Sequence, residues 1–168
     1  IKVAIKKKIK FLTLYAFSTE NWKRPVKEIK YLLKLLDNYI NKELNNLNKK
    51  GVKLIIIGDI NKFPIKLKQN LKNSVQTTKK NSKIQLNIAL NYGSRQEIIK
   101  SFKKIKKKSL PINEKNISKF LYTSDIPDPD ILIRTGNTNR LSNFLLWQSI
   151  YSEIFFEKKL WPDFNEKD

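Results

Sequence analysis

The sequence contains no cysteine, no histidine and no methionine among its 168 residues. The absence of cysteine excludes disulfide bonds, thiolate metal sites and cysteine nucleophiles. The absence of histidine removes the commonest general base and the commonest transition-metal ligand. Any metal is therefore expected to be a hard cation held by oxygen atoms, and Mg²⁺ is the first choice.

Long apolar segments are absent as well. No apolar run approaches the roughly 20 residues that span a bilayer, and no secretory signal peptide is visible. We therefore expect a cytoplasmic location. The sequence starts at Ile1 without a methionine, which indicates a fragment that lacks its natural start. With 40% hydrophobic residues, the chain can form one domain over residues 1–168 with a substantial core.

Arginine is scarce in a strongly basic chain. The net charge is +20, and lysine and arginine together number 35, yet the sequence has only four arginines. A lysine-rich surface attracts polyanions, including nucleic acid, anionic lipid and diphosphates. However, the accompanying excess of isoleucine and asparagine is typical of AT-rich coding, so the charge is only weak evidence for which of these partners the protein binds. The arginines are more informative because each follows a predicted strand: Arg24, Arg95, Arg134 and Arg140.

The apolar patterns predict alternating strands and helices. The predicted strands are residues 11–17, 53–57, 84–90 and 131–133, and the predicted helices are the end of one over residues 1–10, then 26–48, 65–80, one ending near 107, and 116–121. Strands that are apolar almost throughout are typical of a parallel sheet covered on both faces. The alternation predicts a single α/β domain with a mostly parallel β-sheet flanked by helices.

Polar segments follow three of the predicted strands, at residues 18–24, 91–95 and 134–142. Ligands of open α/β sheets collect at the carboxyl ends of the strands, so we expect these segments to converge on one edge. Arginine offers a planar fork of donors that suits phosphate or diphosphate. The alternative is that the arginines are structural and pair with local acids.

Three motifs carry a family resemblance. They are YAFSTENWKRP at residues 15–25, LNIALNYG at residues 86–93, and the long stretch at residues 128–164 that contains RLSNFLLWQ and ends in LWPDF. In this order the chain resembles the cis-prenyltransferases, most closely the bacterial undecaprenyl diphosphate synthase type. The resemblance implies a homodimer, soluble or peripheral to a membrane, with a hydrophobic tunnel. It also implies an enzyme that adds isopentenyl diphosphate to farnesyl diphosphate with cis geometry, using Mg²⁺, to make a polyprenyl carrier lipid.

The resemblance also implies roles for individual residues. Arg134, Arg140 and Ser142, with Leu141 between them, resemble the site for the isopentenyl diphosphate head group, and Glu153 resembles the acid that binds Mg²⁺. Asn21 falls where a proton acceptor has been proposed, but a neutral amide is a poor base, so we expect it to position other groups. The remaining positions implied to contact substrate are Ser18, Thr19, Glu20, Trp22 and Arg24.

The long helix predicted after Pro25 resembles the family helix that lines the hydrocarbon tunnel. Its apolar stripe includes Leu32, Leu35 and Leu36. Ordinary core packing explains these leucines equally well. If Ala16 and Leu35 do line the tunnel, larger side chains there are expected to shorten the product.

The chain departs from the family pattern in three places. The family's first motif, an Asp-Gly-Asn-Gly-Arg-Trp loop that supplies a Mg²⁺-binding aspartate, is absent. We therefore expect this polypeptide to be inactive as written and its sheet to lack a strand. Thr138 stands where a glutamate is usual, which puts any role of that glutamate in doubt. The basic C-terminal tail that usually follows LWPDF is short.

Two other functions are compatible with parts of the sequence. A nucleic-acid-binding domain is suggested by the charge and by the 3 Trp, 6 Tyr and 9 Phe residues, but these aromatics concentrate in strands and at residues 144–161. They are not interleaved with lysines as a stacking platform requires, so we expect no nucleic acid partner. A non-catalytic subunit of a two-component cis-prenyltransferase is the second alternative. Retention of Asn21, Arg24, Arg134, Arg140 and Glu153 argues against it.

Overall fold

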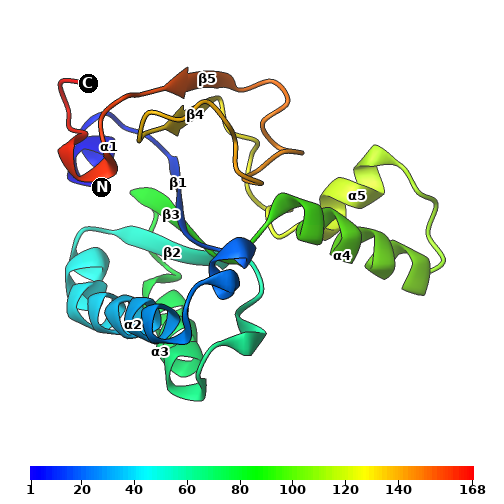
Figure 1. Cartoon of the computed structure of the whole chain (residues 1–168), viewed down its shortest axis with the longest axis horizontal. Helices are drawn as coiled ribbons and strands as arrows, with labels where there is room; N and C mark the ends of the chain where they lie inside the picture. The colour runs from blue at the N-terminus through cyan, green and yellow to red at the C-terminus, as the bar shows by residue number, and fades with distance from the viewer. The chain divides into compact units, whose positions relative to one another are not determined.

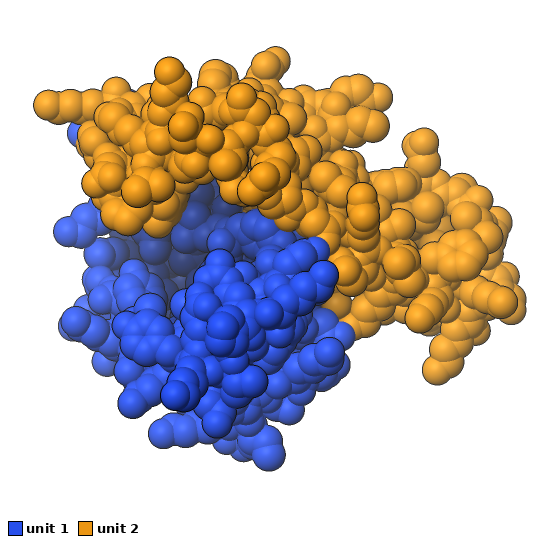
Figure 2. Space-filling view, viewed as in Figure 1, with its two compact units in different colours: residues 1–92 blue, residues 93–168 orange.

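The computed structural model describes residues 1–168 and divides the chain into two compact units. Unit 1 comprises Ile1–Tyr92 and unit 2 comprises Gly93–Asp168, and the two are coloured separately in Figure 2. Each unit contains helices and a parallel sheet of its own.

Unit 1 is built on three parallel strands in the order β1-β3-β2. These are β1 (Phe11–Ser18), β2 (Val52–Ile57) and β3 (Ile84–Tyr92). The central strand, β3, is buried along almost its whole length, which explains why its sequence is so apolar. Helices α2 (Val26–Lys49) and α3 (Ile65–Thr78) cover one face of the sheet (Figure 1). Short helices complete the unit: α1 (Lys2–Lys6), η1 (Thr19–Lys23) and η2 (Ile60–Lys62).

The core of unit 1 lies between this sheet and its two long helices. The 3- to 4-residue spacing of apolar side chains in α2 places one stripe against the sheet. The members of that stripe with less than a tenth of their surface exposed are Ile29, Leu33, Ile40 and Leu47. They pack in one cluster with Leu67 and Leu71 of α3 and with Leu54 and Leu86 of the sheet.

Unit 2 contains two helices and a two-stranded parallel sheet. The helices are α4 (Ser94–Lys107) and α5 (Glu114–Phe120), and the strands are β4 (Ile131–Arg134) and β5 (Glu153–Phe156). The register pairs Ile131 with Glu153 and Arg134 with Phe156. The 3₁₀ turn η3 (Trp161–Asp163) follows near the end of the chain.

The α/β fold class with parallel strands and flanking helices is confirmed, and the predicted helices and four strands match the structure within a few residues. The fifth strand, β5, was not predicted, because its sequence Glu-Ile-Phe-Phe shows no alternation of apolar and polar residues and all four residues are exposed. The strands form two sheets, of three and two strands, where the sequence suggested one. Within the segment expected to be a loop, residues 19–23 form η1. None of the helices combines the length and the apolar character needed to cross a bilayer.

Candidate functional site

The carboxyl end of β1 is organised by a capping box. Ser18, the last residue of β1, caps η1: its side chain accepts a hydrogen bond from the backbone N–H of Asn21. In return, the Ser18 backbone N–H donates to Asn21 Oδ1 at 2.7 Å. The amide oxygen of Asn21 is therefore engaged by the backbone, and its geometry is that of a residue that holds the turn in shape.

This geometry predicts how Asn21 variants behave. Asn21→Ala removes the acceptor for the Ser18 N–H and is expected to lower the free energy of unfolding by about 1 kcal/mol. Asn21→Asp keeps an oxygen at that place and is expected to retain most of the stability. Urea unfolding of both variants measures the difference. Equal stability of the alanine variant and the wild type would show that the capping box contributes nothing.

A second group of contacts joins the carboxyl ends of all three strands of unit 1. Trp22 Nε1 donates to Asn91 Oδ1 at 2.7 Å, and Asn91 Nδ2 donates to the backbone oxygen of Asp59 at 2.5 Å. The Trp22 ring packs edge to face against Phe17 and Phe63, with centroids 5.3 Å and 6.0 Å away. The carboxyl ends of β1, β2 and β3 therefore meet at one edge of this sheet, as predicted for residues 18–24 and for the beginning of residues 91–95. Residues 134–142, the third segment predicted to converge there, follow β4 of the two-stranded sheet.

The other predicted residues of this edge have local partners. Thr19 Oγ1 donates to the carboxylate of Glu20 at 3.0 Å, and Arg24 pairs with Glu28 one helical turn further on. Half of the Arg24 side chain is exposed, so an anion has access to this guanidinium. Tyr15 donates its hydroxyl to the backbone oxygen of Tyr92 at 3.0 Å. Burial, reinforced by the nearby charge of Glu20, raises the pKa of Tyr15 to about 12, so it stays a neutral donor at physiological pH.

In unit 2 the best-defined group is centred on Arg134 at the carboxyl end of β4. Its Nε donates to Thr138 Oγ1 at 3.0 Å, and its Nη1 donates to Ser142 Oγ at 3.2 Å. These bonds fix the plane of the guanidinium and use two of its five N–H groups. Arg140 and Ser142 are exposed in the same loop, with Leu141 partly buried between them. Thr138 thus has a defined role here, as a neutral acceptor for Arg134.

The loop after Arg140 has an unusual backbone that α4 holds in place. Ser142, Asn143 and Leu145 have φ values of 50°, 63° and 46°, which non-glycine residues rarely adopt. The N–H of Ser94 donates to the Asn143 backbone oxygen at 2.8 Å, and Leu146 donates its N–H to Ser94 Oγ at 3.1 Å. Such strained conformations persist only where surrounding contacts impose them, and they concentrate at functional sites.

Sequence reasoning missed a buried acid that supports this loop. Glu97 of α4 is 1% exposed and accepts hydrogen bonds from the Tyr122 N–H at 2.7 Å and from Gln148 Nε2 at 3.1 Å. Gln148 also donates to Thr123 Oγ1 at 2.8 Å. The signal was present in the pattern of α4, because Glu97 shares the buried helix face with Ser101 and Ile105.

Glu153 lies apart from Arg134 in the sheet of unit 2. It is exposed at the start of β5, level with Ile131, whereas Arg134 is level with Phe156 at the other end of the ladder. Three residues along a strand correspond to roughly 10 Å. No group of three or more acidic side chains that could hold a metal ion is present in residues 1–168. The structure therefore does not bring Glu153 to the carboxyl edge at which Arg134 lies.

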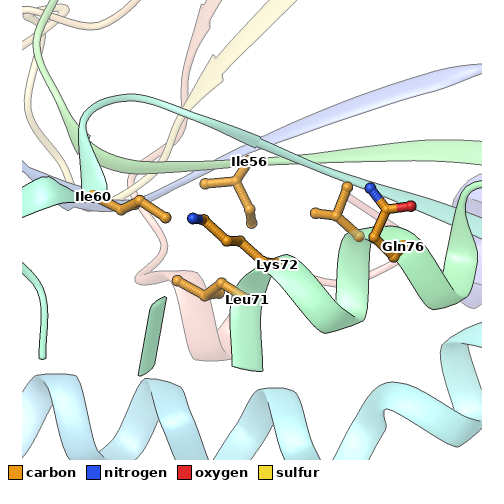
Figure 3. A pocket seen from close by; sticks show the side chains of 6 residues that line it. Ile56, Ile60, Leu71, Lys72 and Gln76 are labelled. Carbon is orange, nitrogen blue, oxygen red and sulfur yellow. The ribbon is translucent and has the colours of Figure 1, made fainter. Parts of the chain in front are cut away.

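An apolar groove lies between β2 and α3 in unit 1 (Figure 3). It has a volume of about 320 Å³ and is lined by Ile56, Ile60, Leu71, Lys72, Val75 and Gln76. On the outer face of α2, Tyr31, Leu35 and Tyr39 form a second apolar stripe, which is exposed, at four-residue intervals. Leu32 and Leu36, by contrast, are partly buried and pack against the core. This agrees with ordinary core packing, the alternative explanation for these two leucines.

These features define a class of protein. It is an α/β protein in which arginines lie at the ends of parallel strands or in the loops after them, and arginines in such places suit phosphorylated ligands. A family profile described as "Putative undecaprenyl diphosphate synthase" matches residues 1–168. The chain therefore belongs to this family of prenyltransferases.

Relatives agree with this assignment. The chain is 47% identical over 167 residues to an isoprenyl transferase of Heliobacterium mobile, covering 95% of this chain and 64% of the relative. It is 46% identical over 172 residues to the ditrans,polycis-undecaprenyl-diphosphate synthase ((2E,6E)-farnesyl-diphosphate specific) of Wigglesworthia glossinidia brevipalpis, covering 98% of this chain and 66% of that protein. The chain thus spans about two thirds of these relatives.

Solved structures share the fold. The crystal structure of a "probable undecaprenyl diphosphate synthase" from Campylobacter jejuni superposes with a TM-score of 0.91 at 39% identity, covering 99% of this chain and 79% of that one. Lavandulyl diphosphate synthase from Lavandula x intermedia, crystallised with dimethylallyl diphosphate, gives a TM-score of 0.93 at 29% identity, with coverages of 99% and 75%.

Proposed function

We propose that this chain is part of a cis-prenyltransferase, which condenses isopentenyl diphosphate with an allylic diphosphate, farnesyl diphosphate, into a long polyprenyl diphosphate. The product would be the undecaprenyl carrier lipid of cell-wall synthesis. The observation that carries the proposal is the Arg134 guanidinium, held by Thr138 and Ser142 in a loop that also exposes Arg140. Membership of the prenyltransferase family supports this reading of an arginine-rich anion site.

The chemistry requires stabilisation of negative charge. Ionisation of an allylic diphosphate leaves an electron-poor carbon and a diphosphate leaving group, and donors that are already oriented stabilise the charge as it develops. In this proposal Arg134 and Arg140 bind the head group of isopentenyl diphosphate, and Ser142 and Leu141 complete that site. On the unit 1 edge, Ser18, Thr19, Glu20, Trp22 and Arg24 contact substrate, and Asn21 positions the turn.

Mg²⁺ is part of the proposal as an ion bound with the diphosphate. Mg²⁺ binds proteins through one or two carboxylates together with substrate phosphates, so the single exposed carboxylate of Glu153 fits its donor chemistry. When bound, the ion would neutralise diphosphate charge. The register of β4 and β5 keeps Glu153 roughly 10 Å from the level of Arg134, so the two residues are proposed to hold separate parts of the site.

The direct test is prenyl transfer by the full-length gene product. Radiolabelled isopentenyl diphosphate, farnesyl diphosphate and Mg²⁺ are incubated with the protein, and lipid products are separated by chain length. Long polyprenyl products that disappear when Mg²⁺ is chelated are expected. Failure to incorporate label, with the protein folded and both substrates present, would contradict the proposed activity. Oligonucleotide binding with a steep salt dependence would instead favour the nucleic-acid alternative.

A tunnel for the growing hydrocarbon is proposed along the exposed stripe of α2. Leu35 is 52% exposed, so a larger side chain fits there without disturbing the core. Leu35→Trp is expected to shorten the main product by one or more isoprene units, because the ring occupies space that the chain needs. Product lengths are compared by reversed-phase separation. Ile65→Trp, a change at an exposed position of α3 outside the stripe, is the control, and identical product lengths in all three proteins would exclude the tunnel role of Leu35.

We also propose a homodimer with a cytoplasmic, membrane-peripheral location, since the product is a lipid. The segment from Ile150 to Phe156 exposes several large apolar side chains, among them Ile150, Tyr151 and Phe155. Apolar residues gathered in this way are typical of a surface that a partner covers. A second copy of the chain is the partner that the family resemblance implies.

A further inference from the structure

Helix α4 is capped by a residue far from it in the sequence. The residue before the helix, Gly93, has no side chain that could accept a hydrogen bond from the first turn. Asn143 supplies the acceptors instead: its Oδ1 accepts a hydrogen bond from the Arg95 N–H at 2.9 Å, and its backbone oxygen accepts one from the Ser94 N–H at 2.8 Å. A helix leaves four N–H groups unpaired at its start, and Asn143 therefore satisfies two of them.

The contact between this helix end and the loop of Asn143 is reciprocal. Asn143 Nδ2 donates to Gln96 Oε1 at 3.1 Å. In the other direction, the buried Ser94 Oγ accepts the Leu146 N–H at 3.1 Å. Four hydrogen bonds thus connect the first turn of α4 to residues 143–146, and three of them involve Asn143. The position of this loop therefore depends on the asparagine side chain.

Asn143 also belongs to the tight turn that carries Ser142. Phe144 donates its N–H to the Leu141 oxygen at 3.1 Å, which closes a turn with Ser142 and Asn143 at its centre. Both central residues have a positive φ, 50° and 63°, as in a type I′ turn. Asparagine is favoured in such turns, whereas serine is not. Ser142 therefore keeps a conformation that it does not prefer, and the contacts of its neighbour with α4 stabilise it.

This conformation places the Ser142 hydroxyl on Arg134. Ser142 Oγ accepts a hydrogen bond from Arg134 Nη1 at 3.2 Å, one of the two side-chain contacts that fix the plane of the guanidinium. Ser142 is exposed, so little packing holds its side chain, and the backbone of the turn decides where the hydroxyl lies. A change in the turn is therefore expected to change the orientation of Arg134.

We propose that Asn143 is a positioning residue for isopentenyl diphosphate. By joining the turn to α4, it keeps the Ser142 hydroxyl on Arg134 and so keeps the guanidinium in the orientation that receives the diphosphate. The inference rests on the proposed function, because that proposal assigns Arg134 to this head group. Both polar atoms of the Asn143 side chain are bonded to α4, so Asn143 acts through Ser142. The alternative is an ordinary helix cap, whose loss lowers stability alone.

The test is the Asn143→Gly variant of the full-length gene product. Glycine adopts a φ of 63° without strain, so the variant can still form the turn and loses the two side-chain hydrogen bonds to α4. We expect kcat/KM for isopentenyl diphosphate to fall about tenfold, the effect of disturbing one hydrogen bond to a charged group. KM for farnesyl diphosphate is expected to stay within about twofold of the wild-type value, because that substrate is assigned to other residues. Steady-state kinetics with each substrate varied in turn measure both values.

A matched control separates positioning from helix capping. Asn113 caps α5 in the same unit, where its Oδ1 accepts the Asn116 N–H at 2.9 Å. Asn113→Gly removes the same kind of cap, so it is expected to lower the melting temperature about as much as Asn143→Gly and to leave the kinetics unchanged. An equal loss of kcat/KM in the two variants would show that general destabilisation is the cause, and it would overturn the inference.

A double-mutant cycle tests whether Asn143 acts through Ser142. Ser142→Ala alone is expected to lower kcat/KM for isopentenyl diphosphate about tenfold, and adding Asn143→Gly is expected to lower it by less than about twofold more. Independent losses that multiply to about a hundredfold would overturn the inference. So would unchanged kinetics of Asn143→Gly beside an active wild type. A folded wild type that transfers no prenyl group would instead contradict the proposed function, and the inference would fall with it.

Discussion

Arg134→Ala is expected to lower kcat/KM for isopentenyl diphosphate by about 10²–10³-fold in the full-length gene product, the usual effect of removing one oriented donor from a site where negative charge develops. In the structure Arg134 is held in one plane by Thr138 and Ser142, so its remaining N–H groups have a defined direction. Steady-state kinetics at saturating farnesyl diphosphate and Mg²⁺ measure the change.

Two controls separate the effect of the planar donor geometry of Arg134 from the effect of its charge and from a general effect of removing a positive charge from unit 2. Arg134→Lys keeps the positive charge but loses the planar donors, and it is expected to recover only a small part of the activity. Lys115→Ala removes a positive charge from the exposed side of α5 in the same unit and is expected to leave the kinetics unchanged. If Arg134→Lys were as active as the wild type, simple charge would be sufficient and the proposed geometry would be wrong.

Gly58→Ala is expected to destabilise unit 1 by about 3–5 kcal/mol, from backbone strain combined with overpacking. Gly58 directly follows β2 and has a φ of 120°, a conformation that is almost exclusive to glycine. An added Cβ would lie 2.0 Å from the backbone oxygen of Leu90 in β3, far inside van der Waals contact. Because a backbone atom cannot move aside cheaply, the turn that carries Asp59 would have to shift. Urea or thermal unfolding measures the loss.

Gly136→Ala is the matched control for this prediction. Gly136 also has a positive φ, 93°, but an added Cβ would meet nothing closer than a Leu160 methyl group at 4.0 Å. This variant is expected to lose only about 1–2 kcal/mol, the cost of the backbone conformation alone. Equal losses at the two positions would mean that the contact with Leu90 contributes nothing and that strain alone explains the need for glycine.

Part of the candidate site could be predicted because it depends on local order along the chain. Parallel strands end at the same edge, so the positions of Ser18 and Asn91 directly after strands were enough to place them together, and the Trp22–Asn91 hydrogen bond of 2.7 Å agrees. Glu153 was also expected at the carboxyl edge of the parallel sheet. Glu153 instead lies at the start of β5, and the sequence of this four-residue strand shows no alternation from which the strand could be predicted. The metal role of Glu153 stays a prediction.

The sequence by itself determined the α/β class, the order of the helices and first four strands, and the arginines that follow strands, because apolar periodicity and chain order are properties of short segments. Only the tertiary structure decided which groups those arginines contact, the buried position of Glu97, and the exposure of Ile99 and Phe102 on α4. Those features depend on which helix face packs inward and on contacts between residues far apart in the chain. A periodic pattern marks an apolar stripe, but only packing determines whether that stripe is covered.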